Sequence, residues 1–312
     1  MTITRTLCRT VISGFCIATF CKISAGYATE ISPIIALGQE NFSFEVADRG
    51  PGLKNIKFEP NVAGVLRLGI SAYGFGIGYS FRGQEKDTKP ENGKTNFEDW
   101  QLSYHSENWG VDTYYQVYDG FYTSNTQSIQ TFPNTDFRNY GFLFRYALEK
   151  SAFTVGGLMD QSPAVIDTAA KSYLVFGYQN HHLDTDISLL QLENAGTDTN
   201  LENLRELRAS SYKIGVGGGK YWVSESKFFF GGLADLIQTF GNYEYEGTTG
   251  TSSLSASTIS FNIKFSTGYA GDSHRFGFSI VGDSTTLKSP GVGSIRPSSN
   301  KMYLYYRTVF NF

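Results

Sequence analysis

The final stretch of the chain, residues 301–312, alternates between two kinds of side chain. Its even-numbered positions are mostly apolar or aromatic, whereas its odd-numbered positions include Lys301 and Arg307. Because successive side chains of a β-strand point to opposite faces, this stretch predicts a strand with one apolar and one polar face, as a lipid-facing barrel strand requires. The aromatic side chains of Tyr306, Phe310 and Phe312 resemble the terminal signal by which outer-membrane barrels are recognised for assembly.

The same alternation recurs along most of the chain. Residues 66–73 and 75–82 alternate on either side of Gly74, which permits a tight turn, so they predict a hairpin. An earlier run, from near Ile34 to Val46, predicts the first strand. Further strands are predicted at residues 99–105, 111–118, 139–146, 152–160, 172–180, 259–266 and 276–283.

Long and short connections alternate between these strands, as they do in barrels with long outer loops and short periplasmic turns. The long connections are predicted near residues 48–60, 83–95, 119–136 and 194–208. The alternation holds through the middle of the chain if residues 186–193 form a strand of their own, which gives 14 strands. The alternative is 12 strands, with the first segment and residues 186–193 outside the wall.

Composition supports an all-β, transmembrane, antiparallel up-and-down β-barrel. Charged residues make up 18% of the chain, against roughly 25% in soluble domains, while aromatic residues reach 15%. No apolar run after the N-terminus is long enough for a transmembrane helix, which leaves a closed barrel as the structure that satisfies every backbone group in lipid. A soluble sandwich would also alternate, but its strands would not carry charges so regularly on the second face.

The N-terminal residues 1–28 are predicted to be a cleaved secretory signal, followed by the barrel at residues 29–312. Arg5 and Arg9 supply the positive start, and Gly26-Tyr27-Ala28 supplies a small-x-small cleavage site. The predicted location is the outer membrane of a Gram-negative bacterium, with membrane lipid and the barrel assembly machinery as partners. Cys8, Cys16 and Cys21 all fall within the signal, which excludes disulfides, thiolate metal sites and cysteine nucleophiles from the mature chain. A net charge of −3 without a basic stripe argues against nucleic-acid binding.

Three short motifs resemble parts of a hydrolase site, a metal site and a phosphate-binding loop, but their positions do not support those sites. His105 and Ser106 are adjacent on a strand and point to opposite faces, so they cannot converge as a hydrolase pair. His181 and His182 diverge in the same way, and no third metal ligand lies near them in the sequence. The run Gly215–Lys220 lacks phosphate-loop spacing and is expected to give a smooth wall or close packing against something inside.

Charged residues on the polar face are the candidate functional set. Unpaired charge in a narrow lumen is costly, so the simplest interpretation is a mutually satisfied network that stiffens the wall. The alternative is a selectivity lining with a slight basic excess that favours anionic solutes. The set consists of Arg67, Arg82, Asp99, Asp112, Arg145, Lys213, Asp235, Lys264 and Arg307.

Several stretches resemble an uncharacterised outer-membrane protein family catalogued as domain of unknown function 4421. They are Glu59-Pro60-Asn61, the hairpin Gly69–Gly78, the segment Asp112–Tyr122, Arg138–Phe142 and Asp160-Gln161-Ser162, within residues 58–175. The resemblance implies an outer-membrane barrel. It implies no activity, substrate or catalytic residue.

The sequence therefore predicts a passive channel or transporter for small solutes, without a cofactor, a metal or an enzymatic activity. The polar, glycine-rich inner face motivates this prediction. A structural or adhesive barrel with a plugged lumen is the alternative. A barrel-embedded lipid hydrolase is the least favoured hypothesis, because His105 is its only candidate residue.

Overall fold

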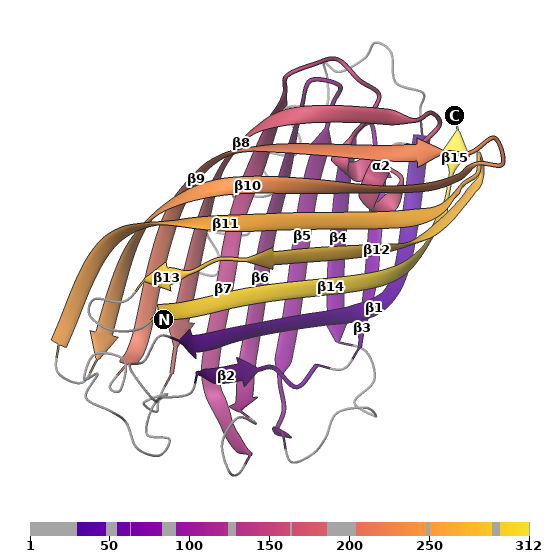
Figure 1. The fold of residues 1–312 in the computed structure, drawn as a ribbon. Helices are drawn as coiled ribbons and strands as arrows, with labels where there is room; N and C mark the ends of the chain where they lie inside the picture. Colours follow the sequence, from indigo (N-terminus) through magenta and orange to yellow (C-terminus); the bar gives the residue numbers. More distant parts are fainter. Residues whose placement is uncertain are drawn as a thin grey trace, which may run out of the picture.

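A computed structural model describes residues 30–47, 55–62, 64–82, 92–123, 129–162, 164–185, 204–247, 250–288 and 294–311. Twelve of its strands form one closed antiparallel barrel, so the all-β barrel and the alternative of 12 strands are confirmed and the prediction of 14 is wrong. The wall runs around the ring in chain order (Figure 1). Its strands are β1 (Glu30–Ala47), β3 (Val65–Ala72), β4 (Phe75–Arg82), β5 (Asn96–His105), β6 (Trp109–Thr123), β7 (Gln130–Ala147), β8 (Ala169–Asp184), β9 (Leu204–Val223), β10 (Phe228–Gly247), β11 (Gly250–Ala270), β12 (His274–Ser284) and β14 (Ser294–Thr308).

The first and last wall strands close the barrel. β1 pairs with β14 in continuous antiparallel register from Ile34 opposite Arg307 to Ala47 opposite Ser294. The short strand β15 (Phe310–Asn311) extends this pairing to Glu30 and Ile31. The first predicted strand therefore belongs to the wall, whereas the 12-strand alternative had placed it outside.

The two ends of the barrel differ. Both described chain ends and the tight turns at residues 73–74, 106–108, 224–227 and 271–273 lie at one end, here called the short-turn end. In outer-membrane barrels this end faces the periplasm. The connections at the opposite, long-loop end include residues 83–95, as predicted, and residues 48–64, where the loop predicted at 48–60 is interrupted by the short strand β2 (Ile56–Glu59). The predicted loops at 119–136 and 194–208 are too long, because β6 and β7 stay paired as far as Thr123 opposite Gln130 and because β9 begins at Leu204.

The largest correction is at residues 152–160, where a strand was predicted. The chain instead forms a short helix, α2 (Val155–Asp160), in the connection between β7 and β8. Thr154 caps it by accepting a hydrogen bond from the Gly157 amide at 2.9 Å, and Gln161 ends it in the left-handed conformation. Val155 and Leu158 are buried three residues apart, which is a helical spacing. The predicted strand at 186–193 lies outside the described residues.

A small strand completes the wall at the long-loop end. β2 (Ile56–Glu59) pairs with β1 through Phe44–Phe58 and with β6 through Phe58–Thr123. It joins the ends of β1 and β6 that extend beyond the shorter β3, β4 and β5, and so satisfies their backbone groups. At the same end β13 (Leu287–Lys288) pairs with β14.

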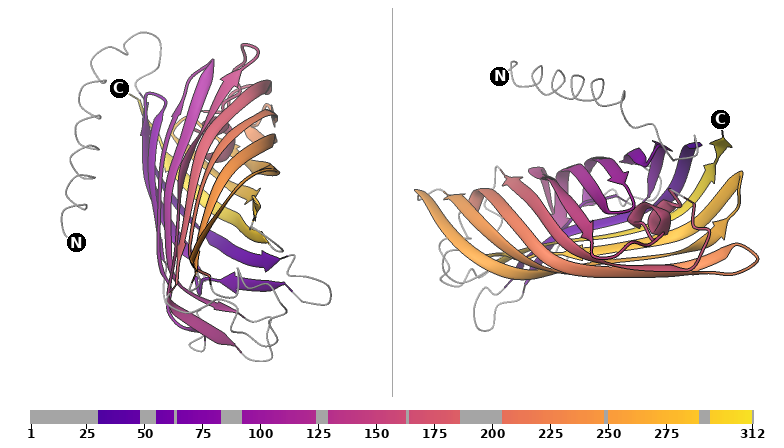
Figure 2. Two further views of the ribbon diagram at one scale, coloured as in Figure 1. Left: turned by 90° about the vertical axis from the view of Figure 1, so that its left-hand side faces the viewer. Right: turned by 90° about the horizontal axis from the view of Figure 1, so that it is seen from above.

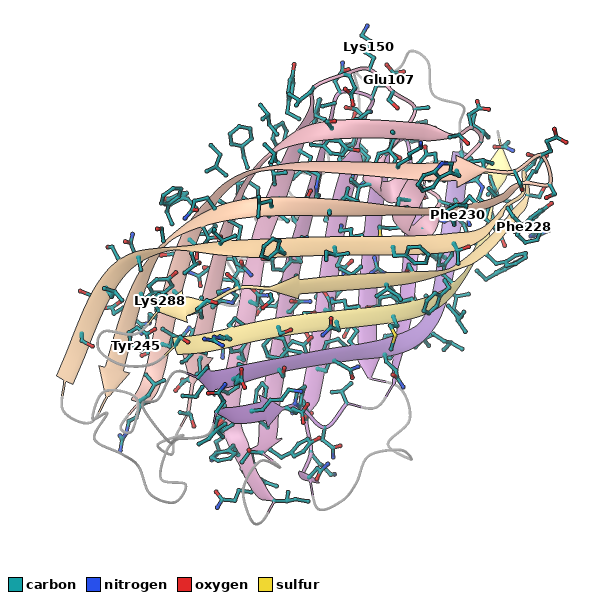
Figure 3. The ribbon with its side chains drawn as sticks, in the orientation of Figure 1. Glu107, Lys150, Phe228, Phe230, Tyr245 and Lys288 are labelled. Carbon is teal, nitrogen blue, oxygen red and sulfur yellow. The ribbon has the colours of Figure 1, made fainter. Side chains whose placement is uncertain are left out.

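The exterior of the wall carries a continuous apolar belt. Alternate residues that point outward are exposed, as the sequence predicts, while their neighbours point inward and are buried. Figure 3 shows Phe228 and Phe230 near the short-turn end of the wall, with Tyr245 and Lys288 toward the opposite end. The belt includes Leu68, Ile70, Ile77, Trp100, Leu102, Tyr115, Phe142, Ile214, Val216, Leu236, Ile259, Phe261, Ile263, Phe265, Leu304 and Tyr306. No helix in the described part of the chain is long and apolar enough to cross a membrane.

The lumen is filled at both ends. At the long-loop end, inward side chains from β1, β2, β6, β7, β8, β9, β10 and β14 form a hydrophobic cluster, with Phe44 and Phe58 stacked at 4.7 Å. At the short-turn end, α2 lies inside the ring of strands and packs against β5, β10, β11 and β12 (Figure 2). The two closures leave a polar section of the lumen between them.

The belt predicts that the loss of stability caused by an outward-facing charge depends strongly on its depth in the membrane. Replacing Ile263, which is flanked on the exterior by Phe261 and Phe265, with lysine should destabilise the barrel by about 2–4 kcal/mol, because a lysine at the bilayer midplane loses its hydration. The measurement is urea unfolding in lipid vesicles. Ser253→Lys on the same face of β11, beyond the apolar belt, is the control and should cost ~1 kcal/mol or less. Equal effects of the two substitutions would contradict a lipid-facing belt.

Candidate functional site

The candidate site is a chamber in the lumen between the two closures. Its volume is about 220 Å³, and it is lined by residues of all twelve wall strands together with α2. The inward positions carry amides, hydroxyls and charges because the strand alternation places every second residue inside. These side chains form three polar groups, each of which links elements that are not all adjacent in the wall.

The first group is centred on Arg145 of β7. Its guanidinium donates to Asp112 of β6 at 2.7 Å and to Asp235 of β10 at 2.7 Å. Asp112 also lies 3.2 Å from Nε2 of His105 and 3.7 Å from the Lys264 ammonium. Arg145 is 2% exposed, so its charge is compensated by these carboxylates rather than by bulk water.

The second group is centred on Lys301 of β14. Its ammonium contacts Asp99 of β5 and lies 3.1 Å from Glu40 of β1, so two buried carboxylates share one cation. Gln101 links this group to Arg67: its amide donates to Asp99 at 3.0 Å, and its oxygen accepts from Arg67 at 2.7 Å. Gln101 therefore joins Arg67 to this group without a direct contact between the guanidinium and a carboxylate.

An amide ladder continues from Asp99 around the wall. Gln116 of β6 donates to Asp99 at 3.2 Å, Asn139 of β7 donates to Gln116 at 3.0 Å, and Gln179 of β8 donates to Asn139 at 3.2 Å. Each amide uses its donor toward the previous strand. The ladder ends at the Gln179 side-chain oxygen, which is buried without a hydrogen-bond partner among the described residues.

The third group fastens α2 inside the short-turn end. Arg307 of β14 lies 3.1 Å from the Asp160 carboxylate and donates to the Asp160 carbonyl at 2.9 Å. The Gln161 amide donates to the Tyr305 hydroxyl at 3.0 Å, while the Gln161 carbonyl accepts from Arg275 at 2.9 Å. Just before α2, Phe153 is fully buried against Tyr221, with ring centroids 4.9 Å apart.

Glycine on β9 makes room for this plug. A Cβ added to Gly219 would lie 2.4 Å from the tip of the Phe153 ring, so no larger residue fits there without displacing it. Close packing against a segment inside, one of the two roles expected of the Gly215–Lys220 run, is therefore seen at Gly219. We use "the plug" for residues 153–161.

The family described as domain of unknown function (DUF4421) matches residues 35–290. The chain belongs to this family. Membership extends the predicted resemblance at residues 58–175 over most of the barrel. The closed wall and its apolar belt make this member an outer-membrane protein, as predicted.

Solved outer-membrane proteins resemble the chain weakly. The outer membrane protease OmpT from Escherichia coli has 10% identity and a TM-score of 0.43, with 93% of this chain and 99% of that chain covered. The Pseudomonas putida toluene transporter TodX has 9% identity and a TM-score of 0.28, covering 92% and 91%. The Ralstonia pickettii toluene transporter TbuX has 10% identity and a TM-score of 0.31, covering 92% and 90%. No curated protein matches the sequence.

The predicted lining residues of this family member mostly face the lumen. Of the predicted set, the ones that the structure places on the inner face are Arg67, Asp99, Asp112, Arg145, Lys213, Asp235, Lys264 and Arg307. Arg82 ends β4, and its side chain lies outside the described part of the structure. Tyr306 and Phe310 of the predicted assembly signal point outward, and Phe312 lies outside the described residues.

Three inner-face charges were missing from the predicted set. They are Glu40, Lys301 and Asp283. The inward position of Lys301 was predictable, because Lys301 shares the polar face of the last strand with Arg307. Glu40 follows the irregular run Gly38-Gln39, where the alternation of apolar and polar residues is too weak to assign a face.

The motifs that suggested chemistry are not assembled into reactive sites. His105 faces inward to Asp112, whereas the Ser106 hydroxyl bonds to the Trp109 carbonyl at 2.8 Å in the turn, so the two diverge as expected. His181 is buried beside Phe137 inside the wall. Within the described ranges, no group of three or more His, Cys, Asp or Glu side chains could hold a metal ion.

The Arg145 group predicts a large stability effect for one substitution. Arg145→Met leaves Asp112 and Asp235 without their shared partner and should destabilise the barrel by about 3–5 kcal/mol. Urea unfolding in vesicles, followed by tryptophan fluorescence, measures it. Arg138→Met is the control, because Arg138 is exposed and, among the described residues, forms its ion pair with Asp136 on its own strand; it should change stability by ~0.5 kcal/mol or less. Unchanged unfolding of Arg145→Met would show that the buried network contributes little.

Proposed function

We propose that this barrel is a channel for small polar solutes that rests in a closed state. The observation that carries the proposal is the chamber itself, a polar section of lumen of about 220 Å³ that adjoins a separate chain segment, the plug. A barrel whose role was only structural would gain more by filling this section with packed apolar side chains, because buried ion pairs contribute little net stability.

The plug has the features of an inner gate. It belongs to the connection between β7 and β8 rather than to the wall, so it can move without breaking the strand ladder. Its polar attachments to the wall at Asp160 and Gln161 involve Arg307, Arg275 and Tyr305. α2 itself contains Gly156 and Gly157, which disfavour a rigid helix.

The hydrophobic cluster at the long-loop end has the features of an outer constriction. Phe42, Tyr118 and Phe137 meet there, with ring centroids 4.4 Å and 4.8 Å from Phe42. A hydrophobic constriction stops ions and polar solutes by excluding water, and it conducts when it widens enough to be wetted. Transport would then require movement at both closures.

A structural barrel with a permanently filled lumen is the second candidate. The full burial of Phe44, Phe58 and Phe137 at the long-loop end favours it, because opening there would expose a large apolar area. An adhesive role rests on the long outer loops, most of which lie outside the described residues. The pair that suggested an enzymatic role, His105 and Ser106, is not assembled in the described part of the chain, since Ser106 turns away from His105.

Secretion through the signal at residues 1–28, assembly by the barrel machinery and recognition of Tyr306, Phe310 and Phe312 remain predictions. The outward position of Tyr306 and Phe310 on β14 and β15 supports the assembly signal, because a recognition factor can reach them.

Gly219→Val tests the gate. The added side chain should push Phe153 out of its place and loosen the plug, so the variant should conduct in planar bilayers at least ~10-fold more often than the wild type, which should be mostly closed. Gly218→Val is the matched control, because its Cβ would meet its nearest atom, the Lys171 carbonyl oxygen, at an ordinary 3.5 Å. It should stay closed.

A second variant tests the gate without the steric change that could misfold Gly219→Val. Asp160→Asn weakens the attachment to Arg307 with almost no change in volume and should also raise conductance. Heat-modifiable gel mobility shows whether each barrel is folded. Folded Gly219→Val and Asp160→Asn barrels that never conduct would favour the structural role instead.

A further inference from the structure

We propose that the chamber is a binding site for a free amino acid, a solute that carries one ammonium and one carboxylate group. The inference rests on the proposed channel function, because it names the class of solute that would occupy the chamber. Two sets of inward-facing groups carry it: an acceptor pair on β11 and β12, and two cations on β3 and β9.

The acceptor pair fits an ammonium group. Asn262 and Asp283 are direct cross-strand partners of β11 and β12, and both line the chamber. The Asn262 side-chain oxygen is buried and has no hydrogen-bond partner among the described residues. The Asp283 carboxylate faces the same cavity and makes no direct ion pair within the described ranges; the opposite charge that acts on it most strongly is that of Lys213. A third such acceptor, the oxygen of Gln179, lies at the end of the amide ladder.

These acceptors match the donors of an ammonium. A primary ammonium has three N–H donors and no acceptor, so it pairs best with a carboxylate and one or two neutral oxygens. Buried acceptor oxygens without a donor are rare in folded proteins, and they are stabilised when a donor reaches them. Asp283 and Asn262 offer a carboxylate and an amide oxygen side by side.

The two cations fit a carboxylate. Lys213 of β9 lines the chamber, and no described residue forms an ion pair or hydrogen bond with its ammonium. Arg67 of β3 uses one N–H toward Gln101 and pairs with no carboxylate among the described residues, so further N–H groups are available. Charge-assisted hydrogen bonds to a carboxylate are the strongest polar contacts that such groups can make.

The remaining chamber charges are already committed. Lys264 pairs with Asp112, Lys301 with Glu40 and Asp99, and Arg307 with Asp160. The groups left over are of both signs, which favours a zwitterion over a simple anion or cation. A cavity of ~10–15 Å³ holds one water, so the chamber's volume of about 220 Å³ admits an amino acid together with some water.

The test is calorimetric binding to the full-length protein in detergent, with three related probes. Glutamine carries both charges, N-acetylglutamine lacks the ammonium, and glutamine methyl ester lacks the carboxylate. We expect glutamine to bind about tenfold or more tightly than either derivative, because each derivative loses one charge-assisted contact. The measurement is repeated on Asp160→Asn, in which a loosened plug gives the probes access to the chamber.

Single substitutions assign each end of the ligand. Asp283→Asn should lower the affinity for glutamine about tenfold and remove its advantage over N-acetylglutamine, whereas Lys213→Gln should remove its advantage over the methyl ester. Lys227→Gln is the control, since it removes a lysine that pairs with Asp272 in an exposed turn, and it should bind like the wild type.

Glutamine that binds neither the wild type nor Asp160→Asn would overturn the proposal. So would equal binding of all three probes, or binding that survives both Asp283→Asn and Lys213→Gln. The proposed channel is judged separately by conductance: a barrel that conducts without binding amino acids refutes this site alone, whereas one that binds them without conducting refutes the channel and keeps the site.

Discussion

The pairing of β1 with β14 is the constraint on which the rest of the structure depends. In lipid an unpaired backbone group costs several kcal/mol, so a sheet with free edges is not stable there. The continuous register from Ile34–Arg307 to Ala47–Ser294 removes both edges, and β15 extends it at the short-turn end. β2 also removes unpaired edges, because it pairs with the ends of β1 and β6 that protrude where β3, β4 and β5 stop.

Closure also decides what the interior contains. Once alternate residues are turned inward, charged side chains such as Arg145 and Lys301 are enclosed and must find partners on adjacent strands or across the lumen. Apolar residues at the long-loop end pack on one another, and the β7–β8 connection folds inward at the short-turn end, where Gly219 leaves room for Phe153. The chamber is the section between these closures, and its chemistry is set by the charges that remain unpaired there.

Strand alternation made the barrel and its inner face predictable, because lipid on one side and polar lumen on the other impose a period of two. The same pattern failed at residues 152–160, where Val155 and Leu158 fit a helical period and Thr154 supplies a cap. It could not reveal that Arg145 joins Asp112 to Asp235, since those partners lie 33 and 90 residues away. Nor could it show that the plug enters the lumen, which depends on the fit of Phe153 against β9.

Cross-linking of the closing seam tests the central claim most directly. Leu37 and Leu304 are opposed across β1 and β14, and both face outward. In a chain that starts after residue 28 and so has no other cysteine, the pair Leu37→Cys and Leu304→Cys should form an intramolecular disulfide on oxidation of the folded protein. The closed barrel predicts a monomer whose cross-link joins its two ends, seen as a shift in denaturing gel mobility that reductant reverses. Free thiols in the folded protein, or cross-links only between different molecules, would contradict closure.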